Sequence, residues 1–106
     1  MSHALIAFVT VANQEEASSL AETLVSECLC ACVNILPAIT SVYRWEGKVQ
    51  KDEERLLLIK TRAVLFDEVA ATIRAAHAYE TPEIIATSVC DGSRDYLLWL
   101  EASTGG

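Results

Sequence analysis

The chain has few glycines and prolines, and it lacks the short motifs that mark nucleotide-binding proteins and several large classes of enzyme. Its 106 residues include four glycines and two prolines, and they contain no glycine-rich phosphate loop and no G-x-S-x-G, H-E-x-x-H or C-x-x-C motif. Eight basic residues stand against 15 acidic ones, which gives a net charge of −7. Because an acidic surface repels a phosphate backbone, we expect no nucleic-acid partner.

Long apolar runs are also absent. The longest candidate, residues 4–11, has the length of a strand, whereas a membrane-spanning helix needs about 20 apolar residues. It lacks the positive front and the cleavage pattern of a signal peptide, so we expect neither a targeting segment nor a membrane partner. Three of the four cysteines crowd into five residues, which does not suit a disulfide framework. Free thiols and a cytoplasmic location are therefore the simpler expectation.

Strand and helix patterns alternate along the rest of the chain. The predicted elements are a strand over 4–11, a helix that Asn13 caps and whose apolar stripe runs to Cys28, strands over 31–45 and 48–60, a helix over 63–77, a strand over 83–90 and a last helix capped by 91–93. This order predicts an α+β, ferredoxin-like βαββαβ sandwich with an added C-terminal helix. A different α+β arrangement is the alternative. We interpret residues 1–106 as one domain, with flexible ends at 1–3 and 104–106.

The two central strands form a hairpin that is long for one small domain. At about 3.3 Å per residue, the strand over 48–60 would span roughly 43 Å. A compact chain of this length has a diameter of roughly 33 Å. The hairpin must therefore overhang, bend at Pro37 or lie against another subunit. Pro37 cannot donate a ladder hydrogen bond, so it predicts a bulge or an edge. Since an isolated hairpin is only marginally stable, we expect self-association.

Two groups of side chains are candidates for metal chemistry. Cys30 and Cys32 would alternate onto one strand face, where thiolates favour soft metals, although buried cysteines more often act as small apolar residues. His77 ends the second predicted helix and is followed by a dense polar segment. It could serve as a ligand or a base, or it could satisfy a backbone carbonyl at the helix end. His3 lies near the terminus and is assigned no role.

The long strands carry a third group. Glu54 and Lys60 alternate onto the same face, and Tyr43 shares a face with Trp45. The simplest interpretation is cross-strand packing with a surface ion pair. The charged run over 51–55 is interpreted as a solvated hairpin tip.

Five strings occur in one order and spacing: Cys32-Val33-Asn34-Ile35, Ser41-x-Tyr43-x-Trp45-x-Gly47-Lys48, Glu54 with Lys60-Thr61, His77-x-Tyr79-Glu80-x-Pro82-Glu83-Ile84, and Tyr96-Leu97-x-Trp99. Together they resemble the CutA family of divalent-cation tolerance proteins over residues 4–102. The resemblance implies a ferredoxin-like fold, a homotrimer built through the long hairpins, a cytoplasmic location and a part in the response to metal ions such as Cu²⁺. It also implies a signalling role, through the trimeric architecture shared with the P-II signalling proteins.

The resemblance also indicates where copper would bind. In the best-known bacterial members of the family, copper ligands are assigned to a cysteine near the end of the first strand and to two adjacent histidines that close the second helix. In this chain those places hold Val9, Ala76 and His77. We therefore expect weak binding of Cu²⁺ or another divalent cation at His77, with Cys32 as the less favoured ligand.

Charged and aromatic residues of the five strings predict a small-ligand pocket in clefts between subunits, where apolar walls surround a few polar groups. Its predicted residues are Lys60, Glu54, Tyr79, Trp45, Tyr96, Trp99 and Glu83, beside His77. A lysine after a buried run needs a partner, which Glu54 or Glu83 could provide. The alternative is an ion pair that aromatic residues seal at the subunit boundary.

Three functions fit these patterns. The first is a trimeric, non-enzymatic binding protein of metal homeostasis. The second is a small-molecule enzyme with His77 as base and Lys60 holding an anion. The third is a structural module whose trimer is itself the product.

Overall fold

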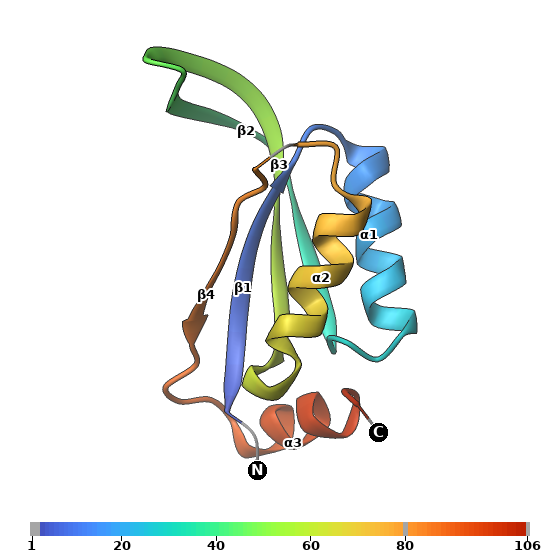
Figure 1. Cartoon of the computed structure of the whole chain (residues 1–106). Helices are drawn as coiled ribbons and strands as arrows, with labels where there is room; N and C mark the ends of the chain where they lie inside the picture. The colour runs from blue at the N-terminus through green and yellow to red at the C-terminus, as the bar shows by residue number, and fades with distance from the viewer. Residues whose placement is uncertain (1–2, 80, 106) are drawn as a thin grey trace.

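A computed structural model describes residues 3–79 and 81–105 (Figure 1). Its elements are β1 (Ala4–Val11), α1 (Gln14–Ser26), β2 (Cys32–Trp45), β3 (Lys48–Arg62), α2 (Phe66–Ala76), β4 (Ile84–Ser88) and α3 (Arg94–Ala102). The strands form one antiparallel sheet in the order β2-β3-β1-β4. α1 and α2 lie on one side of this sheet, and α3 lies at the end away from the hairpin tip. The predicted ferredoxin-like architecture is confirmed.

Local signals set most element boundaries. The Asn13 side chain accepts a hydrogen bond from the Glu16 amide at 2.9 Å, so the predicted cap of α1 is confirmed. The stripe predicted to run to Cys28 was too long, because α1 ends at Ser26 and Cys28 has a φ of 58°. A left-handed residue cannot continue an α-helix, so the chain turns back toward the sheet.

The core lies between the sheet and the two helices. β1 and β3 alternate, so every second side chain points toward α1 and α2. These side chains are fully or almost fully buried against apolar residues of both helices. The core cluster contains Ala7, Val9, Val11, Ala17, Leu20, Leu24, Leu29, Cys30, Leu57, Ile59, Val69 and Ile73. It is built by two helices and one face of one sheet.

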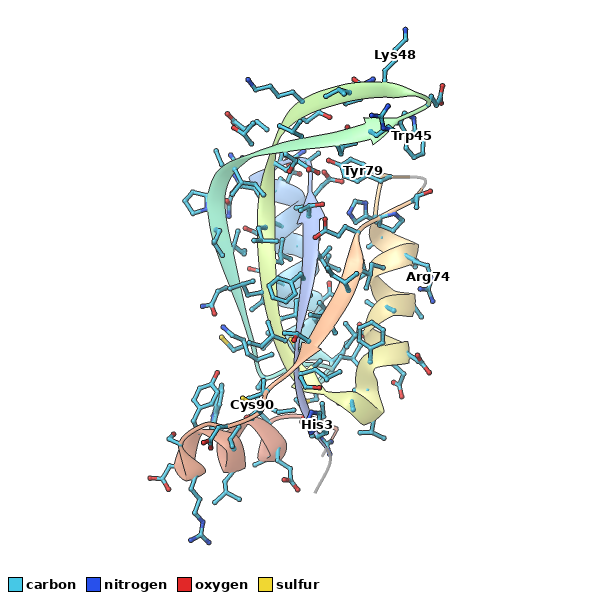
Figure 2. The ribbon with its side chains drawn as sticks, turned by 90° about the vertical axis from the view of Figure 1, so that its left-hand side faces the viewer. His3, Trp45, Lys48, Arg74, Tyr79 and Cys90 are labelled. Atoms are coloured by element: carbon cyan, nitrogen blue, oxygen red, sulfur yellow. The ribbon has the colours of Figure 1, made fainter. Side chains whose placement is uncertain are left out.

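The opposite face of the sheet is apolar but only partly covered. Phe8 pairs with Leu58 on β3 and with Ile85 on β4. Phe8 and Leu58 are half-buried, and Ile85 is 60% exposed. Figure 2 views this face with α1 behind the strands. The accessible area of 6480 Å² also exceeds the roughly 5,800 Å² expected for a folded chain of this mass.

The hairpin of β2 and β3 extends past the rest of the sheet and curves (Figure 1). Its turn is at Glu46 and Gly47, as predicted, with φ angles of 50° and 78°. Two consecutive positive φ values match the twist of a hairpin. The longest dimension of the molecule is 44 Å, against 25 and 23 Å for the others. The expected overhang is therefore present, and we call the part over Ser41–Asp52 the hairpin arm.

Thr104 and Gly105, which the sequence predicts to be flexible, make long-range hydrogen bonds. Thr104 is only 1% exposed. The Arg62 guanidinium donates to its hydroxyl at 2.7 Å and to its carbonyl at 2.6 Å, and the Gly105 amide donates to the Cys28 carbonyl at 2.8 Å. The sequence gave no sign of these long-range partners of Thr104 and Gly105. Residues 1, 2, 80 and 106 lie outside the described part.

Candidate functional site

A cleft of about 640 Å³ lies between the hairpin arm and the segment that joins α2 to β4. Figure 2 shows Trp45 on the arm and Tyr79 on the facing segment. The lining residues are Thr10, Ser41, Val42, Tyr43, Trp45, Asp52, Glu54, Tyr79, Thr81, Pro82 and Glu83. The cleft therefore combines aromatic walls with acidic groups.

A bulge decides which side chains of the arm face this cleft. Leu36 pairs with Leu56, but the next register pair joins Ile39 to Glu54, so β2 has one residue more than β3 between these pairs. The insertion falls at Pro37, as predicted. One extra residue reverses the alternation of side chains between the two faces. Tyr43 and Trp45 consequently share the face of Glu54, rather than pointing away from it.

Two carboxylates of the cleft accept hydrogen bonds from tyrosines. The Tyr79 hydroxyl donates to Glu54 Oε2 at 2.7 Å, and the Tyr43 hydroxyl donates to Asp52 Oδ2. Glu54 is 6% exposed. Partial burial and the adjacent Glu54 carboxylate raise the pKa of Tyr79, so the phenol stays protonated and keeps donating. The hydrogen bond to Asp52 raises the pKa of Tyr43 in the same way.

His77 is fixed by hydrogen bonds at both ring nitrogens. Nε2 lies 2.7 Å from the Thr10 carbonyl oxygen, and the Tyr79 amide donates to Nδ1 at 3.0 Å. A carbonyl only accepts, so Nε2 carries the proton and Nδ1 the lone pair. The ring centroids of His77 and Tyr79 are 4.5 Å apart. His77 thus contacts a backbone carbonyl, but that carbonyl belongs to Thr10 in β1 and not to the end of α2 as the simpler interpretation expected. The same ring accepts from the Tyr79 amide at the cleft.

The residues at the inherited copper positions do not form a ready metal site. Val9 is buried in the core, and Ala76 has no ligand atom in its side chain. Both nitrogens of His77 are already occupied. Across residues 3–79 and 81–105, no group of three or more histidine, cysteine or acidic side chains is placed to hold an ion. A tightly held resident metal therefore does not fit this part of the chain.

The cysteine cluster also differs from its prediction. β2 begins at Cys32, so Cys30 and Cys32 do not alternate on one strand. Cys30 lies in the core, where burial, with a smaller effect of Cys32, raises its pKa to about 12. A thiol that stays protonated is a poor metal ligand. Cys28 and Cys90 are exposed, and all four cysteines are free thiols.

The predicted pocket residues fall into two groups that lie toward opposite ends of the folded molecule. Glu54, Tyr79, Trp45 and Glu83 line the cleft under the hairpin arm. The other three, Lys60, Tyr96 and Trp99, lie toward the α3 end.

Lys60 pairs with Ile6 and Cys32. Lys60 lies six positions along β3 from Glu54, a distance of roughly 20 Å. The expected ion pair between Lys60 and Glu54 is therefore wrong within one chain, although the two residues share a face. Convergence of both groups across subunits stays a prediction.

Tyr96 and Trp99 form an aromatic pair at the α3 end, with ring centroids 5.4 Å apart. Partial burial, with a contribution from nearby Cys32, raises the pKa of Tyr96. Tyr96 is 43% exposed and Trp99 is 47% exposed. These two rings are not among the residues that line the cleft.

Some cleft residues were missed by sequence reasoning. Asp52 was interpreted as part of a solvated tip, yet it accepts from Tyr43 and lines the cleft. Thr10 and Thr81 were not singled out, and Ser41 was named only as part of a family string. Pro37 was the sequence signal that could have identified the cleft residues of the arm. A bulge at Pro37 determines which residues of the arm share a face with Asp52.

Comparison with known proteins identifies relatives over nearly the whole chain. The CutA1 divalent ion tolerance protein family matches residues 5–103. The chain is 45% identical over 100 residues to the divalent-cation tolerance protein CutA of Thermus thermophilus, covering 94% of this chain and 97% of that protein. It is 50% identical over 100 residues to the chloroplastic protein CutA of Arabidopsis thaliana, again over 94% of this chain but only 55% of that protein.

Solved structures give the same result. The crystal structure of CutA1 from Oryza sativa superposes with a TM-score of 0.95 at 48% identity, covering 97% of this chain and 94% of that one. Among the helices within the described part of the chain, none is long and apolar enough to cross a membrane. The matches in sequence and in structure together show that the chain belongs to the CutA1 divalent ion tolerance protein family.

Proposed function

We propose that this chain forms a homotrimer that binds ligands in the cellular response to divalent metal ions. The uncovered sheet face carries this proposal. Its apolar residues, of which Phe8, Leu58 and Ile85 are examples, cover several strands and are only partly shielded within one chain. Extensive exposed apolar surface is typical of an interface, and obligate interfaces are large and hydrophobic.

The hairpin arm supports an assembly of more than two subunits. It extends from the sheet and presents exposed apolar side chains, among them Val42 and Val49, at 65% and 68% exposure. A protruding arm of this kind can cross to a neighbouring subunit and close a ring. The count of three copies follows the family resemblance. Light scattering at micromolar concentration tests it: the mass of a trimer is expected, and the mass of a monomer contradicts the proposal.

For metal, we propose weak, exchangeable binding of Cu²⁺ or another divalent cation at His77. Glu15 and Glu16 line a cavity of about 370 Å³ together with His77. An ion that binds there must displace one hydrogen bond of the imidazole, which lowers its affinity. One imidazole with carboxylates and water gives an open site, whereas clustered thiolates would hold a soft ion tightly.

Calorimetric titration with Cu²⁺, Zn²⁺ and Mg²⁺ tests the metal proposal. Weak Cu²⁺ binding that His77→Ala abolishes is expected, with binding retained when Cys30 and Cys32 are replaced by serine. The opposite pattern assigns the metal to the cysteines. Unchanged binding in both variants excludes both sites.

We propose a binding role rather than an enzymatic one. The lone pair of His77 Nδ1 accepts from the Tyr79 amide, and this hydrogen bond makes the imidazole a weaker general base. Cytoplasmic location is proposed from the free thiols, since a reducing compartment keeps them so.

A further inference from the structure

We propose that the cleft under the hairpin arm binds a small organic cation, an amine or ammonium compound. The inference extends the proposed binding function. It rests on that function in one respect, namely that the protein binds ligands. It concerns a different site from the His77 cavity. Its basis is the charge, burial and aromatic content of the cleft.

The charge of the cleft selects the sign of the ligand. Asp52, Glu54 and Glu83 line it, and none of the described lining residues is lysine, arginine or histidine. The chain as a whole carries a net charge of −7. A phosphate or carboxylate ligand would meet only like charge here, whereas a cation would be attracted into the cleft.

Within the described part of one chain, no cationic side chain pairs with Glu54. Glu54 as a residue is 6% exposed, and its carboxylate accepts a hydrogen bond from the neutral Tyr79 hydroxyl. The ion pair described on this stretch of β3 joins Arg55 to Glu53 at 3.9 Å and leaves Glu54 aside. A buried carboxylate without an opposite charge is costly. A bound ammonium would supply the charge that the described residues do not provide.

The aromatic residues favour an organic cation. Tyr43 and Tyr79 direct their hydroxyls to Asp52 and Glu54, so their ring surfaces are what they can offer to a ligand. Trp45 adds a third ring from the arm (Figure 2). Aromatic faces attract ammonium groups through the ring quadrupole, and they also cover the attached carbon atoms.

The spacing of the acidic groups disfavours a bare metal ion in this cleft. In the part of the chain that the structure describes, no three acidic, histidine or cysteine side chains come together around one point. A volume of about 640 Å³ is that of a site for a small organic molecule. Carboxylates that do not converge on one point suit an organic ligand whose cationic or hydrogen-bond-donating groups are several bonds apart.

Tryptophan fluorescence can test the proposal directly. The chain has two tryptophans, so Trp99→Phe leaves Trp45 as the only reporter. Spermidine and choline serve as cationic probes, citrate as the anionic probe and MgCl₂ as the inorganic one. Saturable binding of spermidine or choline is expected, and the stronger of the two shows whether N–H donors or a quaternary group is preferred.

Matched variants distinguish a site from general attraction. Glu54→Gln should weaken cation binding by about tenfold or more, because a charge-assisted contact is lost. Glu53→Gln removes the same charge from the next residue, on the other face of β3, and should change the affinity by no more than about twofold. If the buried Glu54 variant does not fold, calorimetry on Trp45→Ala applies, with an expected loss of about tenfold.

Several results would overturn the inference: equal weakening by both glutamine variants, tighter binding of citrate, displacement of the organic probe by an equal concentration of Mg²⁺, or no saturable binding. Light scattering and the Cu²⁺ titration on the same samples separate this failure from that of the proposed function. An intact trimer with Cu²⁺ binding but no amine binding overturns only the cleft.

Discussion

The two faces of the sheet have similar composition but different surroundings. On β3, Leu57 and Ile59 are completely buried under the helices, whereas Leu56 and Leu58 are only half-buried on the other side. These four residues are consecutive, so the same run supplies both faces. The difference shows that one face stabilises the chain itself, while the other has apolar area left for a second copy. Substitutions at adjacent positions can separate these two contributions.

The largest expected effect is on the helix-covered face. Leu57→Ala should lower the free energy of unfolding by about 2–5 kcal/mol, because it leaves a cavity in a close-packed core. Urea denaturation at several protein concentrations measures it, and the loss should be the same at each. Leu58→Ala is the matched control, and its loss should vary with protein concentration. Concentration-independent losses of equal size would show that the two faces do not differ in this way.

A charge on the uncovered face should break assembly without unfolding the chain. Leu58→Glu would bury a carboxylate without a partner in any interface formed there, at a cost of several kcal/mol. Light scattering should report a monomer, with circular dichroism unchanged. A fully assembled Leu58→Glu variant would place the interface elsewhere.

A smaller effect is expected where α3 meets the end of β3. Arg62→Met removes both hydrogen bonds to Thr104 and should lower the free energy of unfolding by about 1–2 kcal/mol. Hydrogen exchange at the Gly105 amide should speed up more than exchange in β1. The neighbouring exposed position offers Ala63→Ser as a control. Unchanged exchange at Gly105 would mean that α3 is held by other contacts.

The last effect appears only at high pH and concerns the buried Cys30. Its folded pKa of about 12 lies above the model-peptide value of 9.0, so the folded state keeps a proton that the unfolded state loses. Stability from this group is complete below pH 9 and is lost as pH rises toward 12. Wild type should lose stability more steeply over this window than Cys30→Val. Parallel pH profiles would show that Cys30 titrates alike in both states.

The sequence by itself determined the order of elements, the cap at Asn13, the turn at Glu46 and Gly47, the bulge at Pro37 and the family. These features depend on residues close together in the chain, where spacing and backbone preferences decide the outcome. Only the tertiary structure decided that Tyr79 meets Glu54, that His77 meets the Thr10 carbonyl and that Lys60 lies far from the cleft. Such contacts depend on strand register and on how the chain returns after α2. A single inserted residue in β2 changes which side chains of the hairpin arm face the cleft. No local sequence pattern predicts which residues of the segment after α2 these side chains will contact.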